Sequence, residues 1–496
     1  MSTIREVEAR LTATTTHPFD DDKLHEECGI FAIYGADEAA AHVALGLHAL
    51  QHRGQEAAGI VSFDGRQFHS HRGLGHVGDN FDSVDVIQRL PGFAAIGHNR
   101  YATTGETVLR NVQPLFAELA SGGFAIGHNG NLTNTRELRR ELVQSGCIFQ
   151  STMDSEVIIH LIATSKYPNL IERLVDALKQ VVGAYSLVAL TADTMIGLRD
   201  PMGVRPLVLG DLDGAPIVTS ETCALDIIGA RFVRDVEPGE IVICTKDGVE
   251  SLKPFPPANP HPCIFEYIYF SRPDSFYDGV SIYAVRKKIG AELARESHVP
   301  ADVVIPVPDS GTPAAIGYAE EAGIPFELGI VRNHYVGRTF IEPTQNIRNL
   351  GVRLKHNANR AEIAGKRVIL VDDSIVRGTT SRKIVQMVRD AGATEVHMRI
   401  ASPPTMHPCF YGIDTPSRGE LLAANMDVDA MAGHIGVDTL AYISIDGLYQ
   451  AVGGVKRDAG KPQYCDACFT GEYPIELVDM AQGHQPAQLS LLADSA

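Results

Sequence analysis

The stretch VILVDDSIVRGTT, residues 368–380, restricts the possible folds of this chain more than any other, because it joins a buried strand to a turn suited to an anion. The branched apolar run ends in two adjacent carboxylates, Asp372 and Asp373. A helix is predicted over 381–392, and backbone N–H groups and hydroxyls at its start can hold a phosphate. The residues that supply this turn are Ser374, Arg377, Gly378, Thr379 and Thr380. Phosphate on the turn and a diol or a metal on the acidic pair would make a sugar-phosphate site.

Strands alternate with helices around this stretch. Residues 301–323 predict a strand, a turn and a helix. Further strands are predicted at 324–331, 368–373 and 393–404. This alternation is typical of a parallel sheet with crossover helices, in which ligands bind at the carboxyl ends of the strands. We therefore expect a second anion-binding turn at the same sheet edge, formed by Asp309, Ser310 and Gly311.

Residues 332–355 form a long polar segment with several arginines and no clear periodicity. Such a segment is either a lid whose cations close over an anionic ligand or a solvated surface loop. As a lid, it would bring three side chains to the sugar-phosphate site, namely Arg332, Tyr335 and Arg338.

The composition excludes several classes of protein. A net charge of −18 disfavours binding to nucleic acid, which requires clustered Lys and Arg. No apolar run reaches the length of a membrane-spanning helix, and the first 27 residues lack the features of a secretory signal. We therefore expect a cytoplasmic protein, in which eight cysteines in 496 residues form no disulfide framework.

The N-terminal half carries residues suited to the hydrolysis of an amide. Cys28 opens the segment CGIFAIYG, which predicts a buried strand, and a cysteine there is by itself more often a core residue than a nucleophile. The segments 95–105 and 124–134 share the stem IGHN, and each predicts a strand followed by a turn. Asn129 and Gly130 could donate hydrogen bonds to one oxyanion, or form a plain hairpin turn.

Two charged residues of this half suit the ends of an amino acid. Arg100 could hold a carboxylate with its bidentate fork, and Asp154 could hold an ammonium group. Each could also be a solvated surface charge, which is the more common role of a single charged residue.

Five segments of this half resemble the glutaminase domain of the N-terminal nucleophile hydrolases: CGIFAIYG, HRGQEAAGI, GHNRYATTG, FAIGHNGNLTN and STMDSEVI. The resemblance implies an α+β fold, an αββα sandwich of two antiparallel sheets between helix layers. It also implies that residues 1–27 are a propeptide and that Cys28 is the nucleophile, with Asn129 and Gly130 as the oxyanion hole. A freed α-amino group, with a pKa of about 7.7 to 8.0, can act as general base for its own thiol. Glutamine would be held by Arg100, Tyr101, Thr103 and Asp154.

The C-terminal half resembles the type I phosphoribosyltransferases, an α/β parallel-sheet fold, in PVPDSG, the lid segment and VILVDDSIVRGTT. Both halves in this order resemble the amidophosphoribosyltransferase family over nearly all of residues 28–475. The implied reaction transfers the amide nitrogen of glutamine to 5-phosphoribosyl 1-pyrophosphate and gives 5-phosphoribosylamine, glutamate and pyrophosphate. This is the first committed step of de novo purine biosynthesis.

The resemblance also assigns roles to the two turns. Asp372 and Asp373 would engage the ribose hydroxyls and Mg²⁺, and Ser310 would share the metal. The 5-phosphate would lie on residues 374–380, and the pyrophosphate near Ser310 and its neighbours. Mg²⁺ suits this role because it binds through few carboxylates together with substrate phosphates.

Four cysteines of the C-terminal half remain to be explained: Cys263, Cys409, Cys465 and Cys468. Their spacing alone leaves an iron–sulfur cluster, a zinc ion and no metal equally open. The Bacillus-type branch of the family carries a 4Fe–4S cluster with cysteines in similar contexts, and this branch also has a propeptide. The resemblance therefore implies that these four cysteines ligate a structural 4Fe–4S cluster.

The family further implies feedback inhibition by AMP and GMP and a homo-oligomer, commonly a tetramer. Two other functions were weighed: a sugar-phosphate-aminating amidotransferase, which VILVDDSIVRGTT disfavours, and a non-catalytic regulator that binds nucleic acid, which the net charge and Cys28 disfavour. The expected parts of the chain are a propeptide (1–27), a glutaminase domain (28–250), a Pro-rich connector (251–262), a phosphoribosyltransferase domain (263–479) and a mobile tail (480–496).

Overall fold

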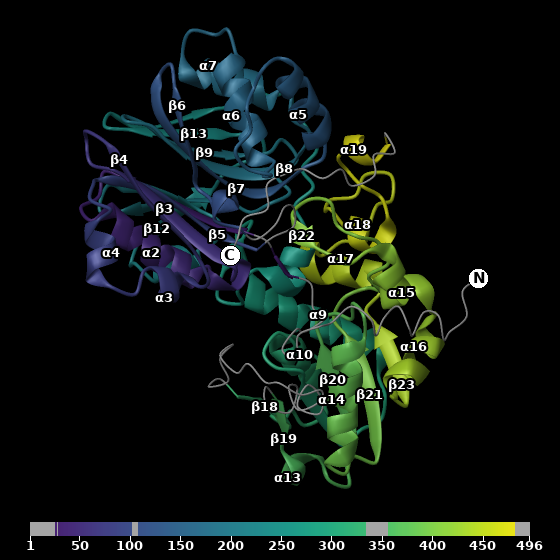
Figure 1. The fold of residues 1–496 in the computed structure, drawn as a ribbon. Coiled ribbons are helices and arrows are strands. Elements are labelled where there is room, and N and C mark those ends of the chain that lie inside the picture. The colour runs from purple at the N-terminus through teal and green to yellow at the C-terminus, as the bar shows by residue number, and fades with distance from the viewer. Residues whose placement is uncertain (1–24, 27, 102–107, 334–355, 482–496) are drawn as a thin grey trace.

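The computed structural model describes residues 25–26, 28–101, 108–333 and 356–481. Two antiparallel sheets stack in the N-terminal half, and a parallel sheet forms the C-terminal half (Figure 1). The fold class expected from the sequence is therefore confirmed.

The first sheet of the N-terminal half has seven strands, all antiparallel to their neighbours. Their order across the sheet is β12 (Arg231–Asp235), β10 (Val208–Leu212), β11 (Ala215–Thr219), β2 (Cys28–Tyr34), β5 (Ala94–Arg100), β3 (Ala57–Phe63) and β4 (Phe68–Leu74). The second sheet has six antiparallel strands. Their order is β14 (Gly248–Leu252), β13 (Ile241–Thr245), β9 (Met195–Arg199), β8 (Gly183–Leu190), β7 (Gly122–Leu132) and β6 (Leu115–Leu119).

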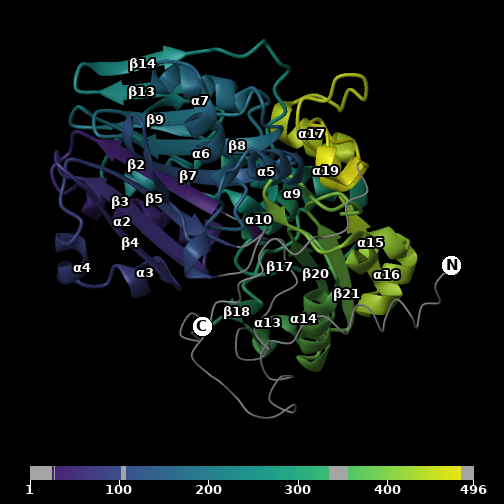
Figure 2. The same cartoon turned by 45° about the horizontal axis from the view of Figure 1, so that its top comes forward.

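Helices cover the outer face of each sheet, which gives the four-layered sandwich visible in Figures 1 and 2. Over the seven-stranded sheet lie α2 (Ala39–Ala49), α3 (Val77–Asn80), α4 (Val84–Gln88) and α8 (Cys223–Asp226). Over the six-stranded sheet lie α5 (Thr135–Gln144), α6 (Ser155–Thr164) and α7 (Leu170–Leu178). Strand β2 is buried on both faces, because Ile30 and Ala32 pack between the sheets while Phe31 and Ile33 pack under α2.

The parallel sheet has the order β17 (Val303–Pro306), β20 (Arg367–Asp372), β21 (Glu395–Ile400) and β23 (Thr439–Tyr442). Its main helices are α9 (Ile282–Ser297), α10 (Thr312–Ala322), α14 (Thr379–Asp390), α16 (Val428–Ile435) and α17 (Ile445–Gly453). The shorter helices are α13 (Arg360–Ile363), α15 (Leu422–Asn425), α18 (Ala467–Thr470) and α19 (Val478–Ala481). Three small pairs complete the strands: β1 (His25–Glu26) with β22 (Ile413–Asp414), β15 (Phe276–Tyr277) with β16 (Val280–Ser281), and β18 (Ile330–Arg332) with β19 (His356–Ala358).

Several expected boundaries were wrong. The strand predicted at 324–331 is not part of the parallel sheet: Phe326 makes one isolated bridge to Val304, and only the last residues enter β18, which pairs outside that sheet. The helix predicted from residue 381 begins earlier, at Thr379, because Gly378 adopts the left-handed conformation that starts it. Strand β14 runs two residues into the expected connector, and α19 includes the first two residues of the expected tail.

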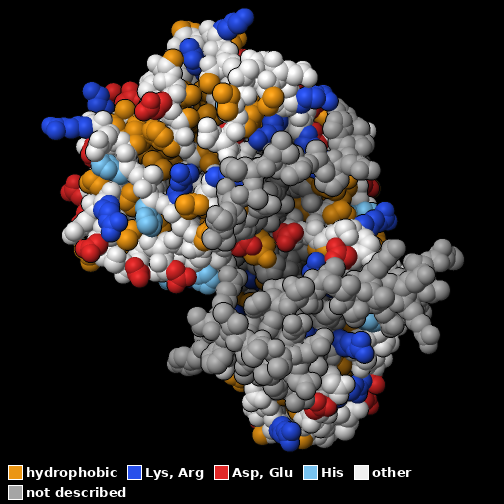
Figure 3. Space-filling view, in the orientation of Figure 1, with side chains coloured by type: hydrophobic (Ala, Val, Ile, Leu, Met, Phe, Trp, Pro, Cys, Tyr) orange, Lys and Arg blue, Asp and Glu red, His pale blue; other side chains and the backbone are white. Residues whose placement is uncertain are grey.

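The described helices include none that is long and apolar enough to cross a membrane. On the face shown in Figure 3, Lys and Arg side chains are scattered singly among acidic and apolar ones. This distribution agrees with the acidic net charge of −18.

A buried network of ion pairs joins the two halves. The Arg53 guanidinium contacts Glu221 through Nε and Glu266 through Nη2, the latter at 2.8 Å. Glu266 Oε1 also forms an ion pair with Arg205 Nη2 at 3.0 Å, and the Glu266 side chain has no exposed surface. Because Glu266 lies in the π-helical turn 266–270, after the connector, this network crosses from one half to the other.

We expect Glu266→Gln to lower the free energy of unfolding by about 3 to 5 kcal/mol, because the change removes the anionic partner of the buried Arg205 and one of the two carboxylates that pair with the buried Arg53. Glu320→Gln is the matched control, because Glu320 pairs with Lys287 at the surface and its loss should cost at most about 1 kcal/mol. Urea unfolding of both variants measures the difference. Equal effects of the two substitutions would contradict the importance of the network.

Candidate active site

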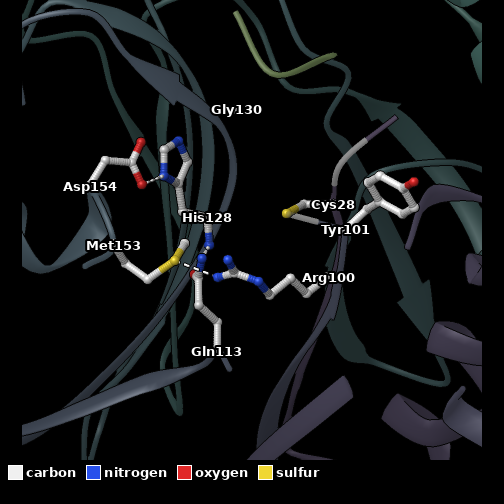
Figure 4. A pocket seen from close by; sticks show the side chains of 8 residues that line it. All are labelled: Cys28, Arg100, Tyr101, Gln113, His128, Gly130, Met153 and Asp154. Atoms are coloured by element: carbon white, nitrogen blue, oxygen red, sulfur yellow. Dashed lines mark hydrogen bonds and ion pairs between the residues drawn. The ribbon is translucent and has the colours of Figure 1, made fainter. Parts of the chain in front are cut away.

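A pocket of about 270 Å³, part of it solvent at its mouth, lies between the two sheets of the N-terminal half. Figure 4 shows Cys28 and Arg100 entering from one side and His128, Met153 and Asp154 from the other. The lining residues are Cys28, Arg100, Tyr101, Gln113, His128, Gly130, Met153 and Asp154.

Cys28 is the first residue of β2 and lies directly opposite Arg100 of β5 in the antiparallel register. Only 6% of its surface is exposed. Its side chain follows the same alternation as Ile30 and Ala32, so it faces the space between the sheets. In Figure 4 its sulfur points toward the side where His128 lies, whereas the ring of Tyr101 points the other way. The thiol is thus placed at the pocket.

Asn129 and Gly130 do not form the expected turn; both lie inside strand β7, opposite Ser186 and Tyr185 of β8. Gly130 has φ of +142°, and a Cβ there would lie 2.1 Å from the carbonyl oxygen of Ala184, so only glycine fits. The Asn129 side chain has no exposed surface, and neither its Nδ2 nor its Oδ1 has a hydrogen-bond partner among the described residues. An unpaired buried amide is unfavourable by about 1 to 3 kcal/mol, which favours a role with a bound ligand.

Arg100 and Asp154 are not solvated surface charges, since they are 1% and 4% exposed. Arg100 donates from Nη1 to the carbonyl oxygen of Asn111 at 2.8 Å and contacts the Met153 sulfur. Asp154 accepts from the backbone N–H of Leu132 at 3.0 Å and of Ser155 at 2.8 Å. Burial by itself would raise the pKa of Asp154, but His128 and these hydrogen bonds outweigh it, so its pKa is lowered and the carboxylate stays charged.

Three pocket residues were missed by the sequence interpretation: Gln113, His128 and Met153. His128 Nδ1 lies 3.5 Å from Asp154 Oδ1, and its backbone N–H donates to Gln113 Oε1 at 2.8 Å. The only signal for His128 was its place in the repeated IGHN stem, directly before Asn129. Thr103, which was expected in this pocket, lies outside the described residues.

A second group of predicted residues meets at the carboxyl edge of the parallel sheet, where β17 and β20 are neighbours. Ser310 Oγ donates to Asp373 Oδ1 at 2.5 Å, and Ser374 Oγ donates to Asp373 Oδ2 at 2.8 Å. Asp372 and Asp373 are 2% and 1% exposed. The two turns therefore share one edge, as expected from the alternation of strands and helices.

The remaining residues of these turns are placed around the acidic pair. Gly311 sits so close to the end of β20 that a Cβ would lie 2.4 Å from the carbonyl oxygen of Val371. Gly378 precedes α14, whose first residues are Thr379 and Thr380. Arg377 Nη2 lies 3.6 Å from Glu420 Oε1, and the two side chains form an ion pair.

The lid segment is described only at its start. Arg332 Nη1 forms an ion pair with Asp309 Oδ2 at 2.8 Å, at the surface. Both residues were predicted to contact the sugar phosphate, and here they contact each other. Tyr335 and Arg338 lie outside the described residues. A buried cation near the acidic pair, Arg286 of α9, was not foreseen: burial lowers its pKa to about 10, and the charge of Asp373 opposes that shift.

The four cysteines of the C-terminal half come together from three segments. The backbones of Cys263 and Cys465 pair through an isolated parallel β-bridge. The backbone N–H groups of Met406 and His407 both donate to the carbonyl oxygen of Cys468 at 3.0 Å. The backbone N–H of Tyr411 lies 3.3 Å from the sulfur of Cys409 and donates to it. Burial raises the pKa of the Cys468 thiol, and the other three cysteines raise it further.

Comparison with known families identifies both halves. A glutamine amidotransferase domain matches residues 98–226, and a phosphoribosyl transferase domain matches residues 276–401. The amidophosphoribosyltransferase of Rhizobium etli is 60% identical over 97% of this chain and 98% of its own length. The chain belongs to the amidophosphoribosyltransferase family.

Other members of the amidophosphoribosyltransferase family agree with this assignment. The Bacillus subtilis enzyme is 50% identical over 92% of this chain and 95% of its own length. The solved structure of glutamine phosphoribosylpyrophosphate amidotransferase from B. subtilis, complexed with ADP and GMP, matches with a TM-score of 0.87 at 48% identity, over 93% of this chain and 99% of that one.

Family membership confirms the enzyme class and the reaction expected from the sequence. The chain is a glutamine-dependent phosphoribosyltransferase that transfers the amide nitrogen of glutamine to 5-phosphoribosyl 1-pyrophosphate in purine biosynthesis. The two other functions, a sugar-phosphate-aminating enzyme and a non-catalytic regulator, are thereby set aside.

The buried His98, which contacts the pocket residue His128, is expected to make the stability of the protein depend on pH. His98 has no exposed surface, its Nε2 donates to the carbonyl oxygen of His128 at 3.0 Å, and burial lowers its pKa from 6.5 to about 3. Below pH 6.5 the imidazole of His98 is protonated in the unfolded chain but stays neutral in the folded chain. Acidification to pH 5 therefore lowers the free energy of unfolding by roughly 2 kcal/mol.

His98→Gln keeps a donor for His128 but does not titrate. Relative to this variant, the unaltered protein should lose roughly 2 kcal/mol of stability between pH 8 and pH 5. Urea unfolding at both pH values measures the change. A stability difference that stays constant with pH would contradict a neutral, buried His98.

Proposed function

We propose that Cys28 is the nucleophile that releases ammonia from glutamine. The observation that carries this proposal is the pocket between the two sheets, where Cys28 lies with two buried charged groups, Arg100 and Asp154. The unpaired amide of Asn129 lies in β7 between two residues that line the same pocket. These groups match the parts of an amino acid amide: a carboxylate, an ammonium and a carbonyl carbon.

In the proposed reaction the Cys28 thiolate attacks the amide carbon of glutamine, and the carbonyl oxygen becomes an oxyanion that Asn129 Nδ2 and the N–H of Gly130 stabilise. Each such donor lowers the activation free energy by roughly 3 to 4 kcal/mol. Ammonia then leaves, and water hydrolyses the thioester to glutamate. Arg100 and Asp154, together with Tyr101, hold the ends of the substrate, and the sequence motif assigns Thr103 to the same task.

The general base in this proposal is the α-amino group of Cys28, which exists only once residues 1–27 have been removed as a propeptide. A free α-amino group has a pKa near neutral pH and can take the thiol proton, whereas an amide nitrogen cannot. The thiol and the amino group belong to the same residue, so this proposal requires no histidine partner.

At the second site, ammonia displaces pyrophosphate from the anomeric carbon of phosphoribosylpyrophosphate. Asp372 and Asp373 accept hydrogen bonds from the ribose hydroxyls, and the turn from Ser374 through Arg377, Gly378 and Thr379 to Thr380 holds the 5-phosphate at the start of α14. The pyrophosphate lies near Asp309, Ser310 and Gly311. The lid residues Arg332, Tyr335 and Arg338 would cover it.

Mg²⁺ is the metal that fits this edge, because Ser310, Asp372 and Asp373 offer oxygen ligands and the substrate supplies the rest. When bound, it would neutralise the charge that develops on the pyrophosphate. Among the described residues, no three acidic, His or Cys side chains form a set that could hold a metal ion alone. Binding is therefore expected to depend on the substrate phosphates.

We propose that the four cysteines of the C-terminal half hold a 4Fe–4S cluster, as the resemblance to the Bacillus-type branch implies. Support comes from the proximity of the four thiols, which belong to three separate segments. In a cluster each cysteine binds a different iron, so neighbouring but separate thiols suffice. When bound, the cluster would cross-link the segments of Cys263, Cys409 and Cys465 with Cys468.

Purine nucleotides such as AMP and GMP are proposed as feedback inhibitors, since the related B. subtilis structure is a complex with ADP and GMP and a second related structure is named an allosteric regulatory enzyme of purine biosynthesis. We also propose that the protein is a homo-oligomer, commonly a tetramer in this family, and that it is located in the cytoplasm.

The test of the proposed function is the release of pyrophosphate from phosphoribosylpyrophosphate. The unaltered protein should release it with either glutamine or ammonia, whereas Cys28→Ala should lose the glutamine-dependent activity and keep the ammonia-dependent activity. Both rates can be measured by coupled assay, with thermal unfolding to confirm that the variant folds. Loss of both activities at unchanged stability would contradict the assignment of Cys28.

Metal analysis of anaerobically purified protein tests the cluster. We expect about four irons and four acid-labile sulfides per chain, and a loss of both in Cys465→Ser. Cys147→Ser is the matched control, because Cys147 lies outside the three cysteine segments and its loss should leave both counts unchanged. Bound zinc without sulfide would refute the cluster.

A further inference from the structure

Strand β7 carries Asn129 and Gly130, and its end is held by residues from the far C-terminal part of the chain. These contacts come from 409–414 and 473–479, which we call the C-terminal clamp. Figures 1 and 2 both show α19, at the end of the clamp, beside α5 of the N-terminal half. The clamp therefore reaches across from the other half to the strand that bears the proposed oxyanion donors.

The first contact lies at Gly130 itself. A Cβ on Gly412 would lie 2.8 Å from the Cα of Gly130, so the two backbones touch, and Gly412 has φ of +101°. Next to this contact, Asn131 Nδ2 donates to the carbonyl oxygen of Phe410 at 3.0 Å, across 279 residues of sequence. A side chain at 412 would have to displace Gly130.

The second contact fixes the chain just after β7. Thr133 Oγ1 donates to the carbonyl oxygen of Glu476 at 2.6 Å, and the N–H of Asp479 donates to the carbonyl oxygen of Thr133 at 2.9 Å. The Asp479 carboxylate accepts from the N–H groups of Arg136 at 2.9 Å and Glu137 at 3.2 Å. Asp479 thus caps the first turn of α5.

The N-cap residue of α5 does not satisfy the first N–H groups of this helix. Its N-cap residue, Asn134, makes no capping hydrogen bond, because its side chain instead donates to the carbonyl oxygen of Gln180 and accepts from the N–H of Val182. The helix therefore relies on a carboxylate from the other half to satisfy its exposed N–H groups.

The two parts of the clamp are tied to each other. Tyr411 Oη donates to the carbonyl oxygen of Ile475 at 2.5 Å and accepts from the N–H of Ile475 at 3.0 Å. Tyr473 Oη donates to the carbonyl oxygen of Pro408 at 2.6 Å, and its ring packs on Phe410. Tyr411 is 1% exposed, so the clamp is a packed unit that contacts β7 at both places together.

We propose that the C-terminal clamp positions the oxyanion donors of the glutamine pocket, which makes Gly412 and Asp479 positioning residues for glutamine hydrolysis. The inference rests on the proposed role of Asn129 and Gly130. A displacement of about 1 Å at such donors can lower a rate roughly 100-fold, because they must lie where the charge develops. The sugar-phosphate turns are formed by other residues, 309–311 and 372–380, so this proposal predicts no change in ammonia-dependent activity there.

Gly412→Ala tests this inference, and Gly436→Ala is its matched control. Gly436 has a similar φ of +89°, but a Cβ there would meet nothing within 4 Å, so the control reproduces the backbone strain without the contact. Gly412→Ala should lower kcat for glutamine hydrolysis roughly 10- to 100-fold with little change in KM, since only the transition state loses an interaction. Its ammonia-dependent activity should equal that of the unaltered protein.

A chemical readout separates displaced donors from general damage. Alkylation of Cys28 by iodoacetamide develops no oxyanion, so its rate, followed by mass spectrometry of the Cys28 peptide, should be unchanged in Gly412→Ala. The proposal would be overturned if the alkylation rate, the glutamine-dependent activity and the ammonia-dependent activity all fell equally. It would also be overturned if kcat for glutamine hydrolysis were unchanged. If the unaltered protein hydrolyses no glutamine, the proposed function fails as well.

Asp479→Ala provides a second test that does not depend on the folding of Gly412→Ala. It should lower kcat for glutamine several-fold at unchanged ammonia-dependent activity, and Asp479→Asn, which keeps an acceptor for α5, should restore most of the rate. Asp427→Ala is the control, because Asp427 caps α16 in the same way, away from β7. Equal effects of the two Ala variants on the glutamine rate would overturn the proposal.

Discussion

The buried charges between the two halves are the constraint on which the rest of the structure depends. Arg53 lies between a carboxylate of its own half, Glu221, and one beyond the connector, Glu266, and none of these side chains is more than 2% exposed. Charges removed from water to this extent must find partners, so the packing of the halves has to keep these pairs together. Ser275 Oγ donates to Glu221 at 2.6 Å and ties the same carboxylate to the C-terminal half.

That packing arrangement gives the two sites a shared frame. Gly54, directly after Arg53, lies so close to β5 that a Cβ would come within 2.7 Å of the backbone nitrogen of Arg100, so the network reaches the glutamine pocket through backbone contact. On the opposite side of the pocket, the clamp approaches β7. The same C-terminal half carries the acidic pair for the sugar phosphate. The residue proposed to release ammonia, Cys28, and the acidic pair proposed to bind its acceptor are thus carried by halves that pack directly against each other.

Local chemistry in the sequence predicted the sugar-phosphate edge well, because both turns follow strands and parallel strands end at one edge. The hydrogen bond from Ser310 to Asp373 confirms this. Prediction failed where packing decides the backbone. The apolar segment 324–331 has the composition of a strand but makes only one isolated bridge to β17, at Phe326. Asn129 with Gly130 looks like a turn, yet both lie in β7, which is joined to β8 by eight residue pairs.

The sequence by itself determined the family, the two kinds of chemistry and most residues proposed to perform them, because those residues lie in short motifs whose side chains and glycines carry the signal. Only the tertiary structure decided which groups line the glutamine pocket with Cys28, and that Gly412 and Asp479 hold the oxyanion strand. Such contacts join residues as far apart in the sequence as Thr133 and Asp479. They arise from burial and close approach of backbones, which leave no local pattern in the chain.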